Sequence, residues 1–136
     1  MSAPLYLHLP HGSPLPALPP GPFKALLIAE SIAMEEWREQ TCESLARAGC
    51  RFFLAWGQDA REWRDAMNGA AAAAGGDLLI ATWHPDQPLS EAMWFSVHQS
   101  DHPELALKYI VILHLTPQAQ REEVLDQFSH AIREEM

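Results

Sequence analysis

Polar and aromatic side chains that could bind a ligand or move a proton occur at four points of the chain, each at the end of an apolar run. His84 and His114 supply imidazoles, which serve near neutral pH as general acids, general bases or metal ligands. Glu30 supplies a carboxylate that could orient an imidazole. The complete set of candidate ligand- or partner-binding residues is Glu30, Ser31, Trp56, Asp59, Thr82, Trp83, His84, Glu91 and His114.

A metal site at these positions would combine His84, His114 and Glu30, with Asp59 or Glu91 as a further oxygen ligand. The chain lacks a local ligand pair such as His-x-x-x-His. It also lacks a nucleophile in a recognised strand–turn–helix elbow. We therefore expect no metal and no cofactor, and we assign no catalytic residue. In the alternative interpretation, each histidine is structural and hydrogen-bonds the loop that follows it.

Two tryptophans and two cysteines also have side chains with a possible role in binding or chemistry. Trp56 and Trp83 stand at predicted strand ends, where they could stack on a ligand or anchor a partner, or close the top of the core under the loops. Cys42 and Cys50 are too few for a disulfide framework. We expect both cysteines to be buried structural thiols.

Four apolar runs predict the strands that position these side chains, at 25–29, 51–56, 78–81 and 108–115. The runs are continuous rather than alternating, which is typical of strands buried on both faces of a parallel sheet. Leu78 to Ala81 in particular predicts a central, fully buried strand that ends in Thr82, Trp83 and His84.

Helical spacing of apolar residues separates and follows the predicted strands. In the first helix this spacing places Met34 on the core-facing stripe. Asp59 is expected to cap the second helix in a capping box with Glu62. Pro117 is expected at the first helical position of the last helix. The predicted inner stripe of that helix comprises Val124, Leu125, Phe128, Ala131 and Ile132.

The alternation of strands and helices predicts an α/β fold. We expect a small three-layer α/β/α sandwich with a four-stranded parallel sheet in the order 2-1-3-4, a Rossmann-like or flavodoxin-like topology. Ligands of such sheets bind at the carboxyl ends of the strands, where the strand order switches. This order would bring Glu30 close to Thr82 and His84, with His114 on the neighbouring strand.

The first 22 residues carry seven prolines and are expected to form a leader that wraps the surface of a single domain at 23–136. Leu5, Leu7 and Leu9 alternate with polar residues, so a short edge strand is possible there. The turn after the first buried strand, residues 29–34, has no glycine that would let a backbone approach phosphate. We therefore expect no nucleotide-binding motif.

Charge and hydropathy exclude several classes of partner. Eighteen acidic and nine basic residues give a formal net charge of -9, and the chain has no cluster of Lys and Arg. Nucleic acids and anionic membranes are therefore not expected as partners. No apolar run approaches the roughly 20 residues of a membrane span, and no signal-peptide pattern is present. We expect a cytoplasmic protein.

Short motifs at the predicted strand ends resemble a family of small bacterial α/β proteins of unknown function. They are Ala55-Trp56-Gly57, Asp59 with Trp63, and Thr82-Trp83-His84 with Glu91. The likeness covers about 23–116. The resemblance implies a single-domain α/β fold and implies no activity, cofactor or catalytic residue.

Two functions of different classes follow from these observations. The acidic, tryptophan-rich composition favours an interaction module, inhibitor- or immunity-like, that binds a basic protein or a second copy of itself. The alternative is a small enzyme or a ligand- or metal-binding domain that uses the carboxyl edge of the sheet. The lack of a catalytic signature favours the non-enzymatic function.

Overall fold

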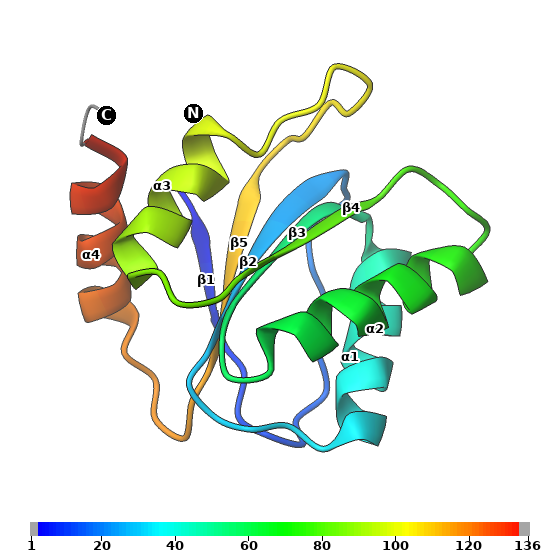
Figure 1. Cartoon of the computed structure of the whole chain (residues 1–136), viewed down its shortest axis with the longest axis horizontal. Helices are drawn as coiled ribbons and strands as arrows, with labels where there is room; N and C mark the ends of the chain where they lie inside the picture. Colours follow the sequence, from blue (N-terminus) through cyan, green and yellow to red (C-terminus); the bar gives the residue numbers. More distant parts are fainter. Residues whose placement is uncertain (1–2, 134–136) are drawn as a thin grey trace.

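The computed structural model describes residues 3–133, which form five parallel strands and four helices (Figure 1). The strands are β1 (Leu5–His8), β2 (Phe23–Ala29), β3 (Cys50–Gly57), β4 (Ile80–His84) and β5 (Ile110–Leu115). The helices are α1 (Glu35–Ala48), α2 (Ala60–Ala73), α3 (Leu89–His98) and α4 (Arg121–Arg133). The predicted α/β class and parallel sheet are therefore confirmed.

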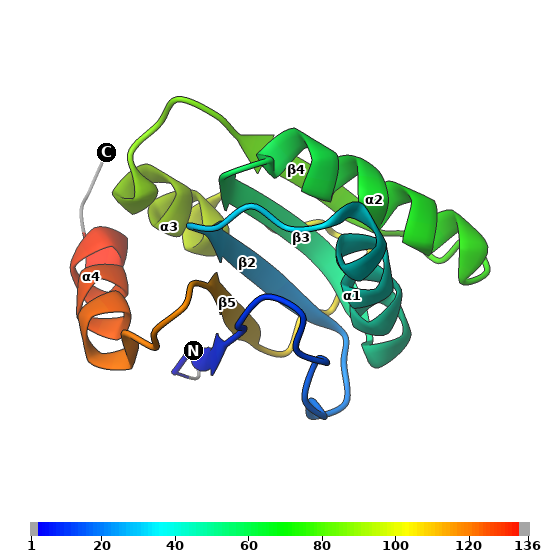
Figure 2. The same cartoon turned by 90° about the horizontal axis from the view of Figure 1, so that it is seen from below.

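The strand order among the described residues is β1-β5-β2-β3-β4, so the predicted four-stranded sheet in the order 2-1-3-4 is wrong. From β2 the chain moves outward through β3 to β4, and both crossover helices, α1 and α2, lie on one face (Figure 2). It then returns to β5 through α3 on the opposite face. This change of face keeps the crossovers right-handed when the direction reverses. The order switches between β2 and β5.

The largest correction concerns β4, which is an edge strand and is not central. Its five residues pair only with β3 among the strands of residues 3–133. Leu78 precedes the strand and is 41% exposed, and Trp83 within it is 40% exposed. The fully buried strands are β2 and β5, which lie side by side in the middle of the sheet.

Two apolar clusters cover the two faces of the sheet. Phe53 and the fully buried Trp63 belong to the cluster under α1 and α2. Leu54 and Phe128 belong to the cluster under α3 and α4. The predicted inner stripe of the last helix is confirmed, because Val124, Phe128 and Ala131 are buried and Leu125 and Ile132 pack against them.

Three local predictions about the helices are wrong. Asp59 stands at the N-cap position of α2 as expected, but its backbone is left-handed with φ of 55° and its side chain makes no capping hydrogen bond, so the predicted capping box is absent. Pro117 lies in a loop, and α4 begins four residues later at Arg121. Met34 precedes α1 and is 68% exposed, so it does not face the core.

The proline-rich N-terminal segment supplies β1, which pairs in parallel with β5 from Leu5 opposite Val111 to His8 opposite His114. The segment then runs back along the molecule. The indole N–H of Trp37 donates to the Ser13 carbonyl at 2.9 Å. The possible edge strand is therefore present, and it carries two polar side chains to the carboxyl edge of the sheet.

Both cysteines are buried and unbridged, as predicted. Burial raises the pKa of the Cys42 thiol to about 12 and also raises the pKa of Cys50. Because the thiolate is the reactive form, neither residue is a nucleophile at neutral pH.

Candidate functional site

The switch in strand order places Glu30 beside His114 at the carboxyl edge of the sheet. Ile28 of β2 pairs with His114 of β5, and the Glu30 backbone N–H donates to the Leu115 carbonyl at 3.0 Å. The side chains also meet, because Nε2 of His114 hydrogen-bonds Oε2 of Glu30. Two candidate residues of the sequence analysis therefore lie at the position where parallel sheets bind ligands.

A third residue, Tyr6, completes a hydrogen-bonded chain. Its hydroxyl lies 2.7 Å from Nδ1 of His114 and accepts the backbone N–H of Gln120 at 3.0 Å. Because the Glu30 carboxylate can only accept, the imidazole proton sits on Nε2 and points to Glu30. In a neutral imidazole Nδ1 is then an acceptor, and the Tyr6 hydroxyl donates to it. We call Tyr6, His114 and Glu30 the Tyr–His–Glu chain.

Glu30 is the exposed end of the Tyr–His–Glu chain, and its other two members are buried. The side chain of Glu30 is 45% exposed, whereas that of His114 is 1% exposed and Tyr6 is 9% exposed. Burial raises the pKa of Tyr6, so its hydroxyl stays protonated and keeps donating. The solvent-facing end is a carboxylate with a fixed imidazole behind it, an arrangement that can accept a proton or bind a cationic or hydroxyl group.

Tyr6 was missed because it lies within a segment that seven prolines mark as irregular. The signal that could have found it is the alternation of Leu5, Leu7 and Leu9 with Tyr6 and His8. A parallel strand there would end at the same edge as the other strands. His8 indeed reaches that edge, where its Nε2 lies 2.7 Å from the Thr116 carbonyl oxygen.

His84 belongs to a separate cluster at the end of β4. Its Nδ1 lies 2.8 Å from the Gln87 amide nitrogen, and its Nε2 lies 2.9 Å from the Thr82 hydroxyl. The imidazole also packs edge-on against Phe95 of α3. Since Nδ1 accepts from Gln87, Nε2 carries the proton and donates to Thr82. These contacts fit the structural interpretation of His84.

The expected approach of Glu30 to Thr82 and His84 is wrong, and His84 does not meet His114. Strands β2 and β3 stand between β5 and β4. At about 4.8 Å per strand, the two histidines stand on strands roughly 14 Å apart. No group of three or more His, Cys, Asp or Glu within 3–133 has the geometry to hold a metal ion.

Three of the remaining candidate residues, Trp56, Trp83 and Asp59, make local contacts of their own. The Trp56 indole donates to the Gln87 carbonyl at 2.8 Å and so anchors the loop after β4. The Trp83 ring lies 4.1 Å from the Arg64 guanidinium carbon. Oδ2 of Asp59 lies 4.0 Å from Nη1 of Arg38. Ser31 is half-buried beside Glu30, and Glu91 is exposed on α3.

Burial lowers the pKa of His84, which predicts that this residue weakens the fold in mild acid. The unfolded chain then takes up a proton more readily than the folded chain as pH falls below about 6.5. Stability from His84 is present above that pH and is lost below it. We expect His84→Gln to reduce the loss of unfolding free energy between about pH 6.5 and 5. Urea unfolding of both proteins at each pH measures this, and identical pH slopes would contradict it.

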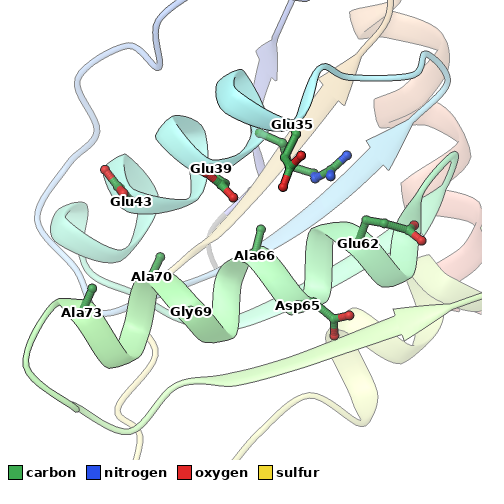
Figure 3. Close-up of a pocket in the computed structure, with 10 residues that line it drawn as sticks. Glu35, Glu39, Glu43, Glu62, Asp65, Ala66, Gly69, Ala70 and Ala73 are labelled. Carbon is green, nitrogen blue, oxygen red and sulfur yellow. The ribbon is translucent and has the colours of Figure 1, made fainter.

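A groove of about 390 Å³ lies away from the sheet edge, between α1 and α2 (Figure 3). Glu35, Glu39 and Glu43 follow one another at one-turn intervals along α1. Ala66, Ala70 and Ala73 point from α2 toward α1, and Asp65 points away from it (Figure 3). The residues lining this α1–α2 groove are Glu35, Arg38, Glu39, Glu43, Glu62, Asp65, Ala66, Gly69, Ala70 and Ala73. Five acidic residues and one arginine thus line the groove, and two of the five, Glu43 and Asp65, pair with arginines outside the lining.

Sequence reasoning missed the α1–α2 groove because its parts have ordinary local explanations. A glutamate every four residues is typical of a solvated helix face, and an alanine-rich stripe is typical of helix packing. Only the packing of α1 against α2 places the two features opposite each other.

None of the helices in the described part of the chain is long and apolar enough to cross a bilayer.

Comparison with known proteins assigns the chain to a protein family. A search of curated proteins and a search of solved structures each returned no match. A family model described as a domain of unknown function, DUF7684, matches residues 4–131. The match covers almost the whole chain, includes β1 and confirms the predicted likeness to an uncharacterised family. The chain therefore belongs to the DUF7684 family of domains of unknown function.

Proposed function

We propose that this protein is a cytoplasmic protein-interaction module, inhibitor- or immunity-like, that binds a basic partner in the α1–α2 groove. The observation that carries the proposal is the charge of that groove, whose lining contains five acidic residues and one arginine. Glutamates four residues apart lie about 6 Å apart along a helix. A partner segment with lysines or arginines at a similar interval would meet one carboxylate per turn of α1.

The floor of the groove supports the same proposal. Gly69 lies inside α2, where alanine would be more favourable by about 1 kcal/mol. A Cβ at this position would meet no atom within 4 Å, so folding of α2 does not require glycine. The missing side chain keeps the groove open above α2. A partner side chain could therefore lie between the helices with its apolar stem on the alanines and its charge at the carboxylates.

Charge reversal in the groove tests the proposal. We expect Glu39→Lys/Glu62→Lys to weaken binding of a basic partner about tenfold or more, because two attractive contacts become repulsive. A matched control is Glu104→Lys/Glu122→Lys, which makes the same change in net charge at exposed positions outside the groove. A helical alanine-based peptide with a lysine every fourth residue serves as the probe, measured by fluorescence anisotropy at low and high salt.

The same three proteins then serve as baits in lysate of the source cell. The expected result is a basic protein held by the wild-type chain and the control, lost from the groove variant, and released by salt. Equal capture by the control and the groove variant would place binding outside the α1–α2 groove. If neither the peptide probe nor the lysate gives any binding at low salt, the proposal that the protein is an interaction module is wrong.

The Tyr–His–Glu chain favours a second candidate function, a small enzyme or ligand-binding domain. Its half-exposed carboxylate lies where strand order switches and is oriented by a buried imidazole. A screen of small amines and polyols by protein NMR tests this candidate. Shifts centred on Glu30, Ser31 and His114 would support it, and shifts confined to the groove would oppose it.

A further inference from the structure

The outer side of β4 is an open sheet edge among the described residues. The strand forms its ladder with β3, from Ile80 opposite Phe52 to His84 opposite Trp56, and no strand within 3–133 lies on its other side. An open edge presents alternate N–H and C=O groups to solvent, which is a template for a further strand. We propose that this edge pairs with β4 of a second copy of the chain, continuing the sheet across a two-fold axis.

The composition of β4 does not match its exposure. Residues 78–83 read Leu-Leu-Ile-Ala-Thr-Trp, an uncharged run of the kind found in strands buried on both faces. In the single chain, Leu78 and Trp83 are 41% and 40% exposed, and the four residues between them are half-buried. The equally apolar β5 is fully buried. A further strand beside β4 would bury the apolar side chains that are exposed or half-buried in the single chain.

The strand at the opposite edge of the sheet, β1, is better protected against pairing with another chain than β4 is. β1 has four residues, and Pro4 and Pro10 flank it on both sides. Proline on both sides of an edge strand is a device that stops it from pairing with another chain. β4 is five residues long, contains no charged residue and has an adjacent proline, Pro85, at one end only; its nearest carboxylates, Asp77 and Asp86, lie outside it. β4 is therefore the less protected edge.

The lack of charged residues on β4 favours pairing with a second copy of the chain over binding of the basic partner proposed for the α1–α2 groove. The chain carries a net charge of -9, so most of its surface repels another copy. Residues 78–84 have no Asp, Glu, Lys or Arg, and the Arg64 guanidinium that lies over the Trp83 ring is paired with Asp65, so two copies can approach along β4 without facing an unpaired like charge. A basic protein would find no carboxylate on this strand to recognise it. Self-pairing here leaves the α1–α2 groove for a different partner.

The side chains of β4 are also self-complementary about its middle residue. In an antiparallel pair centred on Thr82, Ile80 faces His84 of the second copy and Ala81 faces Trp83 of the second copy. Each exposed indole would then lie beside a methyl group on the same face of the joined sheet. The two-fold axis makes both contacts occur twice, as in an isologous interface.

Sedimentation equilibrium across a concentration series from about 1 to 300 μM tests the pairing, because self-association depends on concentration. We expect the wild-type mass to rise from 15.2 kDa toward twice that value. Trp83→Glu puts a carboxylate on the edge and should remain monomeric throughout. Met34→Glu, at a residue that is 68% exposed on another loop, is the matched control and should behave as the wild type does.

Hydrogen exchange of the wild-type chain gives a second readout that needs no variant. Alternate amides of β4 should exchange more slowly at high concentration, and the amides of β1 should not change. A wild-type chain that is monomeric at the highest concentration would overturn the proposal. So would Trp83→Glu dimers as stable as those of the wild type. Neither result depends on whether a basic segment binds the groove.

Discussion

Replacing Gly57 with alanine is expected to destabilise the folded chain by about 2–5 kcal/mol. Gly57 ends β3 with φ of 100°, a conformation that L-amino acids with a Cβ avoid. A Cβ there would lie 2.2 Å from the Ala29 carbonyl oxygen at the end of β2. That oxygen is held in place, because it accepts the backbone N–H of Gln58 at 2.8 Å. The clash is therefore with backbone that cannot move aside cheaply.

Gly12→Ala is the matched control for this prediction. Gly12 has a similar φ of 86°, but an added Cβ would meet nothing within 4 Å. It should show only the backbone cost of about 1–2 kcal/mol. Urea unfolding of the wild type and both variants measures the difference. Equal losses in the two variants would mean that the approach of Gly57 to Ala29 is not tight in solution. The larger loss at Gly57 would explain glycine after Trp56 as a packing requirement.

Replacing His114 with alanine is expected to cost about 3–5 kcal/mol of unfolding free energy. The substitution leaves a cavity beside a central strand and removes the acceptor of the buried Tyr6 hydroxyl. Tyr6→Phe should cost less, about 1–3 kcal/mol, because it removes one hydroxyl and leaves Nδ1 of His114 and the Gln120 N–H without it. Glu30→Gln should cost least, under about 1 kcal/mol, since solvent screens its half-exposed carboxylate.

A double-mutant cycle shows whether the Tyr–His–Glu chain acts as a unit. Tyr6 and Glu30 bond opposite nitrogens of one imidazole, so Tyr6→Phe/Glu30→Gln should differ from the sum of the single losses by at least about 0.5 kcal/mol. His130→Ala is the control, because that histidine is 71% exposed on α4 and should change stability by no more than about 0.5 kcal/mol. Strict additivity would show that the three residues stabilise the fold independently.

Strand order was the main feature that sequence patterns could not predict. Residues 78–81 and 110–113 are both continuous apolar runs, and a run records burial without recording its neighbours. Right-handed crossovers permit either the order 2-1-3-4 or the observed one. The expected approach of Glu30 to His84 depended on that choice and failed with it. Glu30 instead contacts His114, because these residues end neighbouring strands in the structure, whereas the expected order placed another strand between theirs.

The candidate site likewise has one part that the sequence predicts and another part that it does not. The type and place of Glu30 and His114 at strand ends could be predicted, because parallel strands deliver their carboxyl ends to one edge. Tyr6 could not be predicted as their partner, because its contact with His114 spans 108 positions of the chain and local periodicity records nothing at that range. The α1–α2 groove likewise exists only once two separately ordinary helices pack together.

The amino-acid sequence by itself determined the α/β class, the parallel sheet, the buried thiols and the inner stripe of α4. These features depend on composition and on the spacing of apolar residues, which act over a few neighbouring positions. Only the tertiary structure decided which strand lies at the edge, that Tyr6 backs His114, and that five carboxylates line one groove. Those outcomes come from packing between distant segments, where the fit of whole faces outweighs each local preference.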